Sequence, residues 1–325
     1  MFKPDNIQEY DDEQTLACER LLVTLLRFLG PWGKTVTLIG GLVPTLLYEE
    51  GGHVGTQDVD LVLDLEKIKS TEAYSSIDKN LKRLGLERGQ NEDKQVQNWR
   101  WVRRDEGEPP LTLEFLCPSP DQQGLKIVPL KPDGQKRLSA LGLPGAHLVL
   151  TDFEERVLTA DMLDGHGSAT VTVRMAGVVA YVVLKALAYE DRVEHKDAYD
   201  LIYILMRHPA GPGGVGALFA AKMADKPDEP LYDRALDILV QRFLSDELTD
   251  GAAKDGPTSY ARFTAPNDPE EQQGEAKVWR FKTKGGRPVA GGGEKVKQQR
   301  QHGTKLRGRQ QEVFKDISVP RMANF

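Results

Sequence analysis

The chain is poor in cysteine and has no long apolar run. Its 325 residues include two cysteines, Cys18 and Cys117, so a disulfide framework is excluded and a reducing compartment is favoured. No stretch reaches the ~18 consecutive apolar residues of a membrane span. The acidic N-terminal stretch MFKPDNIQEYDDEQ also lacks the apolar region of a signal peptide. The histidines and cysteines show no zinc-ligand spacing. We therefore expect a cytoplasmic protein without a membrane partner.

Acidic residues are scarce at the C-terminal end of the chain. From Lys277 onward, 13 Lys and Arg face 3 Asp and Glu, a net charge of +10, so the rest of the chain carries −16 within the overall −6. A basic tail on an acidic body suggests contact with a polyanion or with the body itself. A solvated tail that does little is the alternative interpretation.

Length and periodicity predict more than one domain. We expect an α/β (α+β) fold: a mixed sheet with flanking helices over residues 1–174, a helical domain over 175–250, and a basic, Gly-rich, low-complexity tail over 251–325 whose composition predicts disorder. The expected strands lie at 35–41, 59–65, 97–104, 111–117, 125–130, 147–150 and 170–174. The expected helices lie at 12–29, 43–50, 71–85, 175–192, 196–208 and 229–248.

Three acids interrupt apolar strand patterns. Asp58 and Asp60 in GTQDVDLVLD are two positions apart, so on a strand they point to the same face. Two such carboxylates repel unless a cation lies between them, and oxygen ligands suit Mg²⁺. Glu114 in LTLEFL is a second acid in an alternating strand. The alternatives are that Asp58 caps a turn, that Asp60 pairs with a basic residue, and that Glu114 faces water. Asp64 reads as a strand-end or helix-cap acid.

A pair of glycines, Gly40 and Gly41, follows the expected strand at 35–41. Glycines there allow a phosphate to approach the backbone closely, near amides at the start of the next helix. Turns also need glycine, so the pair alone does not decide between a phosphate site and an ordinary turn.

The order of these features resembles the polymerase-β-like nucleotidyltransferase superfamily. Its elements are a strand, Gly-Gly, a helix, a T-x-D-x-D strand, a helix and a later strand with a carboxylate. The resemblance implies that the three carboxylates hold two Mg²⁺ and that the glycine turn holds a triphosphate. Many members have Ser where this chain has Gly41, which leaves only backbone amides at that position. The matching positions are Gly40, Gly41, Thr56, Asp58, Asp60 and Glu114.

A second motif lies in VVLKALAYEDRVEHKDAYDLIYIL, which reads K-x(6)-R-x(3)-K-D-x-x-D-L. It is similar to the helical region of the AbiEii-type nucleotidyltransferases, the toxins of abortive-infection systems, and the resemblance covers roughly residues 35–208. On an unbroken helix Lys185, Arg192 and Lys196 would share one face, which suits triphosphate binding. An Arg often precedes the first Asp of D-x-D by four residues in that family, and here the position is Val54.

A bend near Glu194 and His195, with a new helix starting at Lys196 and Asp197, is favoured over an unbroken helix. Asp197 would then cap a new helix, and Asp200 would be a general base or a partner of Arg192. Lys185 would be either a phosphate ligand or a lysine whose stem lies along the edge of the core.

The resemblance implies a Mg²⁺-dependent nucleotidyltransferase that moves a nucleoside monophosphate from an NTP to an RNA (tRNA) or protein acceptor. A toxin of a toxin–antitoxin or phage-defence system, with a cognate antitoxin, would follow, and the NTP would lie between the sheet domain and the helical domain. The alternatives are a catalytically silent binding or antitoxin module, and an RNA-binding protein acting through its tail. The implied catalytic residues are Asp58, Asp60, Glu114 and Lys185. The implied nucleotide-binding residues are Gly40, Gly41, Thr56, Lys185, Arg192, Lys196 and Asp200.

Overall fold

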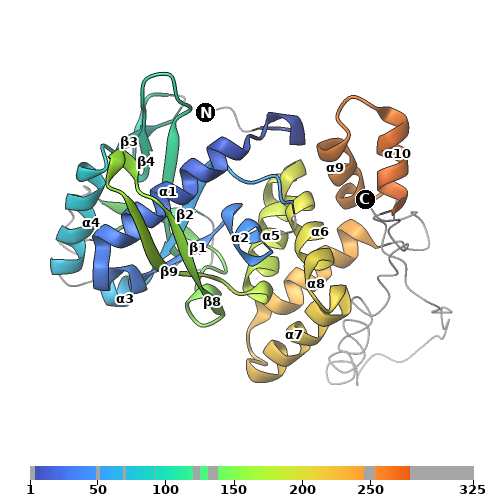
Figure 1. Cartoon of the computed structure of the whole chain (residues 1–325). Helices are drawn as coiled ribbons and strands as arrows, with labels where there is room; N and C mark the ends of the chain where they lie inside the picture. The colour runs from blue at the N-terminus through green and yellow to red at the C-terminus, as the bar shows by residue number, and fades with distance from the viewer. Residues whose placement is uncertain are drawn as a thin grey trace, which may run out of the picture. The chain divides into compact units, whose positions relative to one another are not determined.

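The computed structural model describes residues 4–48, 52–68, 71–91, 93–119, 125–130, 138–244 and 253–278. These residues belong to two compact units. The sheet unit spans Gln8–Leu184, and the helical unit begins at Lys185 and includes Asp5–Ile7. The protein is a mixed α/β protein with a mixed sheet and flanking helices (Figure 1).

The sheet unit contains a nine-stranded sheet in the order β3-β4-β5-β2-β1-β9-β8, with β7 pairing with both β5 and β6. The β2–β5, β1–β9 and β5–β7 pairs are parallel and the others are antiparallel. The strands are β1 Val36–Ile39, β2 Asp58–Leu63, β3 Glu87–Gln90, β4 Val96–Arg103, β5 Leu111–Pro118, β6 Lys126–Pro129, β7 Ser139–Leu143, β8 Phe153–Asp161 and β9 Ser168–Ala176.

Helix α1, Asp12–Leu29, packs against β2, β5, β8 and β9 and against α4 (Figure 1). It begins where the Asp11 carboxylate accepts a hydrogen bond from the Glu13 backbone N–H at 2.9 Å, an N-cap. It ends at Gly30, whose φ of +57° favours glycine. The other helical segments of this unit are η2 Gly30–Thr35, α2 Leu42–Leu47, α3 Leu65–Ile68, α4 Thr71–Arg83, η4 Leu148–Leu150 and η5 Leu163–Gly165, and the boundary at Ile7 divides η1 Ile7–Glu9 between the two units.

The helical unit includes the end of α5, because the boundary between the units falls inside that helix. Within the unit, α6 packs against α7 and α9, and α9 packs against α8 and α10. Its helices are α5 Val178–Arg192, α6 His195–Arg207, α7 Gly211–Asp225, α8 Pro230–Phe243, α9 Asp255–Thr264 and α10 Pro269–Val278.

Most of the expected elements are present, with shifted ends, but one strand is wrong. In place of the strand expected at 147–150, Leu148–Leu150 form η4, and the Leu148 N–H bonds to the Gly145 carbonyl in a turn rather than to a neighbouring strand. Sequence reasoning missed α7, whose four glycines lower its helix propensity. It also missed β8, most of whose side chains are exposed, so no apolar alternation marks it. The further missed strands and α-helices are β3, β7, α3, α9 and α10.

The expectation of disorder from residue 251 is wrong for the residues described there. Helices α9 and α10 lie in this region. The Tyr199 ring of α6 lies 5.9 Å from the Tyr260 ring and 5.0 Å from the Phe263 ring of α9, and the Tyr189 hydroxyl bonds to Ser259 at 2.9 Å. The contacts of these few large side chains stabilise α9 although the segment is polar in composition. The rest of the expected tail, 279–325, lies outside the described residues.

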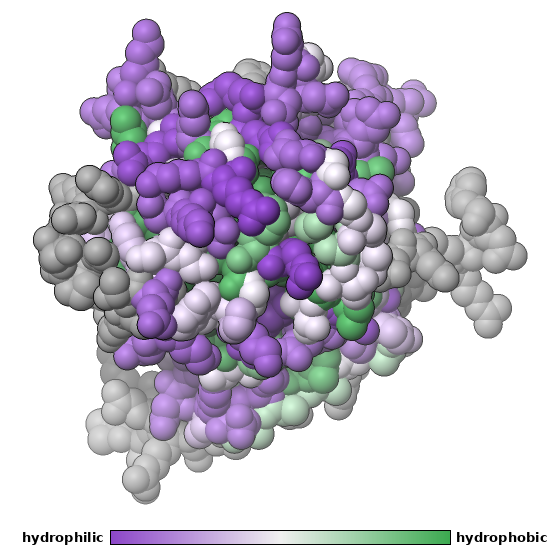
Figure 2. All heavy atoms as spheres, turned by 60° about the vertical axis from the view of Figure 1, so that its left-hand side comes forward, coloured by the Kyte–Doolittle hydropathy of each residue, from purple (hydrophilic) through white to green (hydrophobic). Residues whose placement is uncertain are grey.

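The units divide between Leu184 and Lys185, whereas the sequence prediction placed the boundary after residue 174. In the view of Figure 2, hydrophilic residues cover most of the visible coloured surface, and hydrophobic residues form small patches between them. Among the described residues, no helix combines the length and the hydropathy that crossing a bilayer requires.

Candidate functional site

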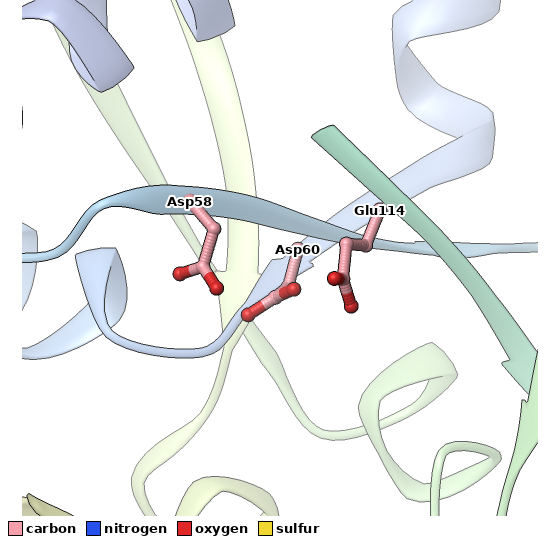
Figure 3. Close-up of side chains that lie close together, drawn as sticks. All are labelled: Asp58, Asp60 and Glu114. Atoms are coloured by element: carbon pink, nitrogen blue, oxygen red, sulfur yellow. The ribbon is translucent and has the colours of Figure 1, made fainter. Parts of the chain in front are cut away.

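Three carboxylates converge on neighbouring strands of the sheet unit. Asp58 and Asp60 lie on β2 and Glu114 lies on β5, where the parallel register places Glu114 directly opposite Asp60. One carboxylate oxygen from each lies within 4.8 Å of the others, a spacing that could hold a metal ion. Figure 3 shows the three side chains pointing to the same side of the strands. The three acids expected from the sequence therefore meet.

The residues between these acids are buried, which fixes the direction of the acids. Val59, Leu61 and Leu113 are 0% exposed. Because side chains alternate along a strand, Asp58, Asp60 and Glu114 face the opposite side, where they are partly exposed. Asp64 has a different role: its carboxylate accepts from the Lys67 N–H at 3.4 Å, just before α3. Its interpretation as a helix cap is confirmed.

The glycine turn lies beside the triad. Gly40 follows Ile39, which pairs with Asp60 across β1 and β2. Gly40 has a φ of +76°, and a Cβ added there would lie 2.0 Å from Asp60 Oδ2. Gly41 has an ordinary φ of −69° and precedes α2. Gly40 therefore depends on being glycine, for its backbone and for the space that Asp60 occupies, whereas the backbone conformation of Gly41 is open to any residue.

Thr56 hydrogen-bonds to the carboxylate of Asp58. The buried Thr56 hydroxyl donates to Asp58 Oδ1 at 2.8 Å, and the Thr56 N–H donates to the Thr15 hydroxyl of α1 at 3.1 Å. Cys18 of α1 is also fully buried near this loop. Burial, followed by the charges of Asp58 and Asp60, raises the pKa of the Cys18 thiol well above its usual value. Cys18 is therefore a neutral thiol that packs behind the carboxylates.

A basic residue that sequence reasoning missed contacts the triad. Arg100 of β4 lies opposite Glu114 of β5 in antiparallel register. Its Nε donates to Glu114 Oε1 at 2.6 Å, and its Nη2 contacts the same oxygen. The available signal was its place between the buried Trp99 and Trp101 on an expected strand, because alternation directs the start of the Arg100 side chain to the other face of the sheet. The sequence does not say which strand lies alongside.

The second motif forms a buried ion cluster within the helical unit. Asp197 accepts from Lys185 at 2.8 Å and from Arg192 Nε at 2.7 Å. Asp200 pairs with Lys185 at 2.6 Å and with Lys196 at 2.9 Å. The carboxylates of Asp197 and Asp200 are 1% and 0% exposed. The five residues therefore form one network of three cations and two anions.

The cluster confirms one expectation and corrects another. The helix is broken: α5 ends at Arg192, Val193 has a φ of +50°, and α6 begins at His195 with Glu194 as its N-cap. The bend is thus confirmed, and the assignment of Asp197 as a cap is wrong, because its carboxylate faces Lys185 and Arg192 instead.

Burial and neighbouring charges shift the pKa values of residues in this cluster. Burial would raise the pKa of Asp197, but the charges of Lys185 and Arg192 outweigh it and hold that pKa below its usual value. Burial, together with the charge of Lys185, lowers the pKa of Lys196 despite the attraction of Asp200. Lys185, Arg192 and Lys196 each have a buried carboxylate partner, and their role as phosphate ligands stays a prediction.

Comparison with known protein families and with curated proteins gives no match.

Proposed function

We propose that this chain is a divalent-metal-dependent nucleotidyltransferase of the AbiEii type. It would move a nucleoside monophosphate from an NTP to an RNA, such as a tRNA, or to a protein. The observation that supports this most is the carboxylate triad of Asp58, Asp60 and Glu114, whose ligand oxygens lie within 4.8 Å of one another beside Gly40. The toxin or phage-defence role and the cognate antitoxin rest on the resemblance of the motifs.

The donor set fits a hard divalent cation. The three groups offer only carboxylate oxygens, which suit Mg²⁺. Three neighbouring carboxylates also repel one another, and a cation between them relieves that repulsion. Asp58, Asp60 and Glu114 would hold the metal, as two ions in this proposal. When bound, Mg²⁺ supplies charge that stabilises a transferring phosphoryl group.

The protein's own contribution is positioning, as is general for phosphoryl transfer. Thr56 fixes the Asp58 carboxylate through its 2.8 Å hydrogen bond. Gly40 leaves the space in which Asp60 lies and allows a phosphate to come close to the backbone. We assign the neutralisation of phosphate charge to Lys185, with Arg192 or Lys196.

Labelled nucleotide transfer tests the proposal. The full chain is incubated with each of the four α-³²P-labelled NTPs, Mg²⁺ and either total tRNA or cell extract. Label should pass to one class of acceptor, and Asp58→Ala, Asp60→Ala and Glu114→Ala should each abolish the transfer while the circular dichroism spectrum stays unchanged. Asp64→Ala is the matched control, because Asp64 follows the same strand but caps α3, and it should remain active.

Near-normal turnover in any triad variant would refute the assignment of the active site. Metal-dependent stabilisation with no transfer to any acceptor would instead favour the catalytically silent module.

A further inference from the structure

Arg100 is built into the sheet so that its guanidinium reaches Glu114. It lies opposite Glu114 in the β4–β5 register, and its Nε donates to Glu114 Oε1 at 2.6 Å. The two side chains are 24% and 13% exposed, so water screens the pair only in part. The contact is therefore stronger than a typical surface ion pair.

Two neighbouring residues constrain the side chain of Arg100. On the adjacent strand β3, a Cβ at Gly89 would lie 2.9 Å from Cγ and 3.1 Å from Cδ of Arg100, so the missing side chain of Gly89 makes room for the stem. The guanidinium carbon also lies 5.0 Å from the centre of the Trp99 ring, within the range of a cation–π contact. The arginine is thus constrained at its stem and at its head.

The position of this arginine matters for the charge of the site. The triad carries three formal negative charges, and Arg100 contributes a positive charge in direct contact with one of them. A divalent cation at the triad would be attracted by the carboxylates and repelled by the guanidinium. Coulomb repulsion between a guanidinium and a divalent cation about 5 Å apart corresponds to about tenfold in affinity even at the dielectric constant of bulk water, and to more at the lower effective dielectric of partly buried groups.

We propose that Arg100, paired with Glu114, is an internal counter-charge that weakens divalent-metal binding in the absence of an anionic ligand. The inference rests on the metal site of the proposed function but not on the transfer reaction. The competing role is purely geometric: hydrogen bonds from Arg100 would orient Glu114 and so strengthen metal binding. The two roles predict opposite effects when the charge is removed.

Titration with Mn²⁺ alone separates the roles. Free Mn²⁺ is followed by its electron paramagnetic resonance signal at low ionic strength, where screening is weakest, with the full chain and no nucleotide. Arg100→Ala removes charge and hydrogen bonds, Arg100→Gln removes the charge but keeps a donor and most of the stem, and Arg100→Lys keeps the charge. Arg88→Ala is the matched control, an arginine of the neighbouring strand that lies over Trp101 rather than at the triad.

We expect Arg100→Ala and Arg100→Gln to bind Mn²⁺ about tenfold more tightly than the wild type. Arg100→Lys and Arg88→Ala should stay close to the wild type. Weaker or unchanged binding in Arg100→Gln would overturn the inference, and weaker binding in Arg100→Ala alone would assign the geometric role. Circular dichroism and melting temperatures identify any variant that has lost its fold, and Arg100→Gln keeps the test valid if Arg100→Ala does so.

Asp60→Ala distinguishes failure of this inference from failure of the metal site. Mn²⁺ binding that disappears in Asp60→Ala but does not change in Arg100→Gln would overturn only the role of Arg100. Absence of Mn²⁺ binding in the wild type and in every Arg100 variant would overturn both proposals.

Discussion

Replacing Gly40 by alanine places a methyl group where the carboxylate of Asp60 lies. The new Cβ would be 2.0 Å from Oδ2, 3.0 Å from Cγ and 3.1 Å from Cβ of Asp60. Because Cβ of Asp60 is also close to the added methyl group, rotation of the carboxylate about the Cβ–Cγ bond does not relieve the whole contact. The Asp60 side chain or the backbone must therefore shift. The backbone adds a second cost, since φ is +76°.

Gly30 provides a matched control that separates these two costs. Its φ is +57° and nothing lies within 4 Å of an added Cβ, so Gly30→Ala introduces the backbone strain of a positive φ without a steric contact. That strain costs about 1–2 kcal/mol of unfolding free energy. Forcing Asp60 out of its preferred rotamer adds about 0.5–1.5 kcal/mol, so Gly40→Ala should cost about 1.5–3.5 kcal/mol in metal-free buffer.

A double-mutant cycle with Asp60→Ala isolates the contact. Truncation of Asp60 removes the Oδ2 and Cγ contacts and leaves only the one at 3.1 Å. Gly40→Ala should therefore cost about 1 kcal/mol less in the Asp60→Ala background than in the wild type. Urea unfolding followed by tryptophan fluorescence measures these unfolding free energies. The signal reports on the sheet unit, because Trp32, Trp99 and Trp101 all lie there.

The reasoning is refuted if Gly40→Ala costs no more than Gly30→Ala, or if the two changes in the cycle are additive. Gly40→Ala should also weaken Mn²⁺ binding, which Gly30→Ala should leave unchanged, since only the first displaces a carboxylate of the triad.

Three further predictions concern the helical unit. Asp197→Asn removes one carboxylate partner of the buried Lys185, which keeps Asp200, and one of the partly exposed Arg192, so at pH 7 it should lower the unfolding free energy by about 1.5–3 kcal/mol. Folding lowers the pKa of Asp197 below 3.8, so the stabilisation is complete above that pH and is lost as the pH falls through the folded-state pKa. Urea unfolding at pH 7 and below pH 4 should show that the difference in unfolding free energy between wild type and variant shrinks in acid. An equal difference at both pH values would contradict the pairing. A chain ending at residue 250 should melt at a lower temperature than one ending at residue 278, because it lacks Tyr260 and the rest of α9; equal melting temperatures would show that α9 adds no stability. Mg²⁺ with an NTP should raise the melting temperature more than either alone, and an undiminished shift in Lys185→Ala would exclude that lysine as a phosphate ligand.

Local pattern determined the elements and the direction of side chains within them. The period of two along β2 places Asp58 and Asp60 on one face whatever surrounds the strand. The leucines of α1 and its flanking Asp11 and Gly30 define that helix from one end to the other. The bend before α6 was also readable as an alternative. These features depend on residues close in sequence, so they need no knowledge of the fold.

Only the tertiary structure decided which strands and helices meet. Glu114 joins Asp60, and Arg100 joins Glu114, because β5 lies between β2 and β4, and strand order depends on contacts between distant residues. Asp197 looked like a cap, but its burial against Lys185 gives it a different partner. The polar segment around α9 looked disordered, yet a few aromatic contacts with α6 suffice to order it. The amino-acid composition of a segment does not show where its few apolar side chains make contact, whereas folding depends on those contacts.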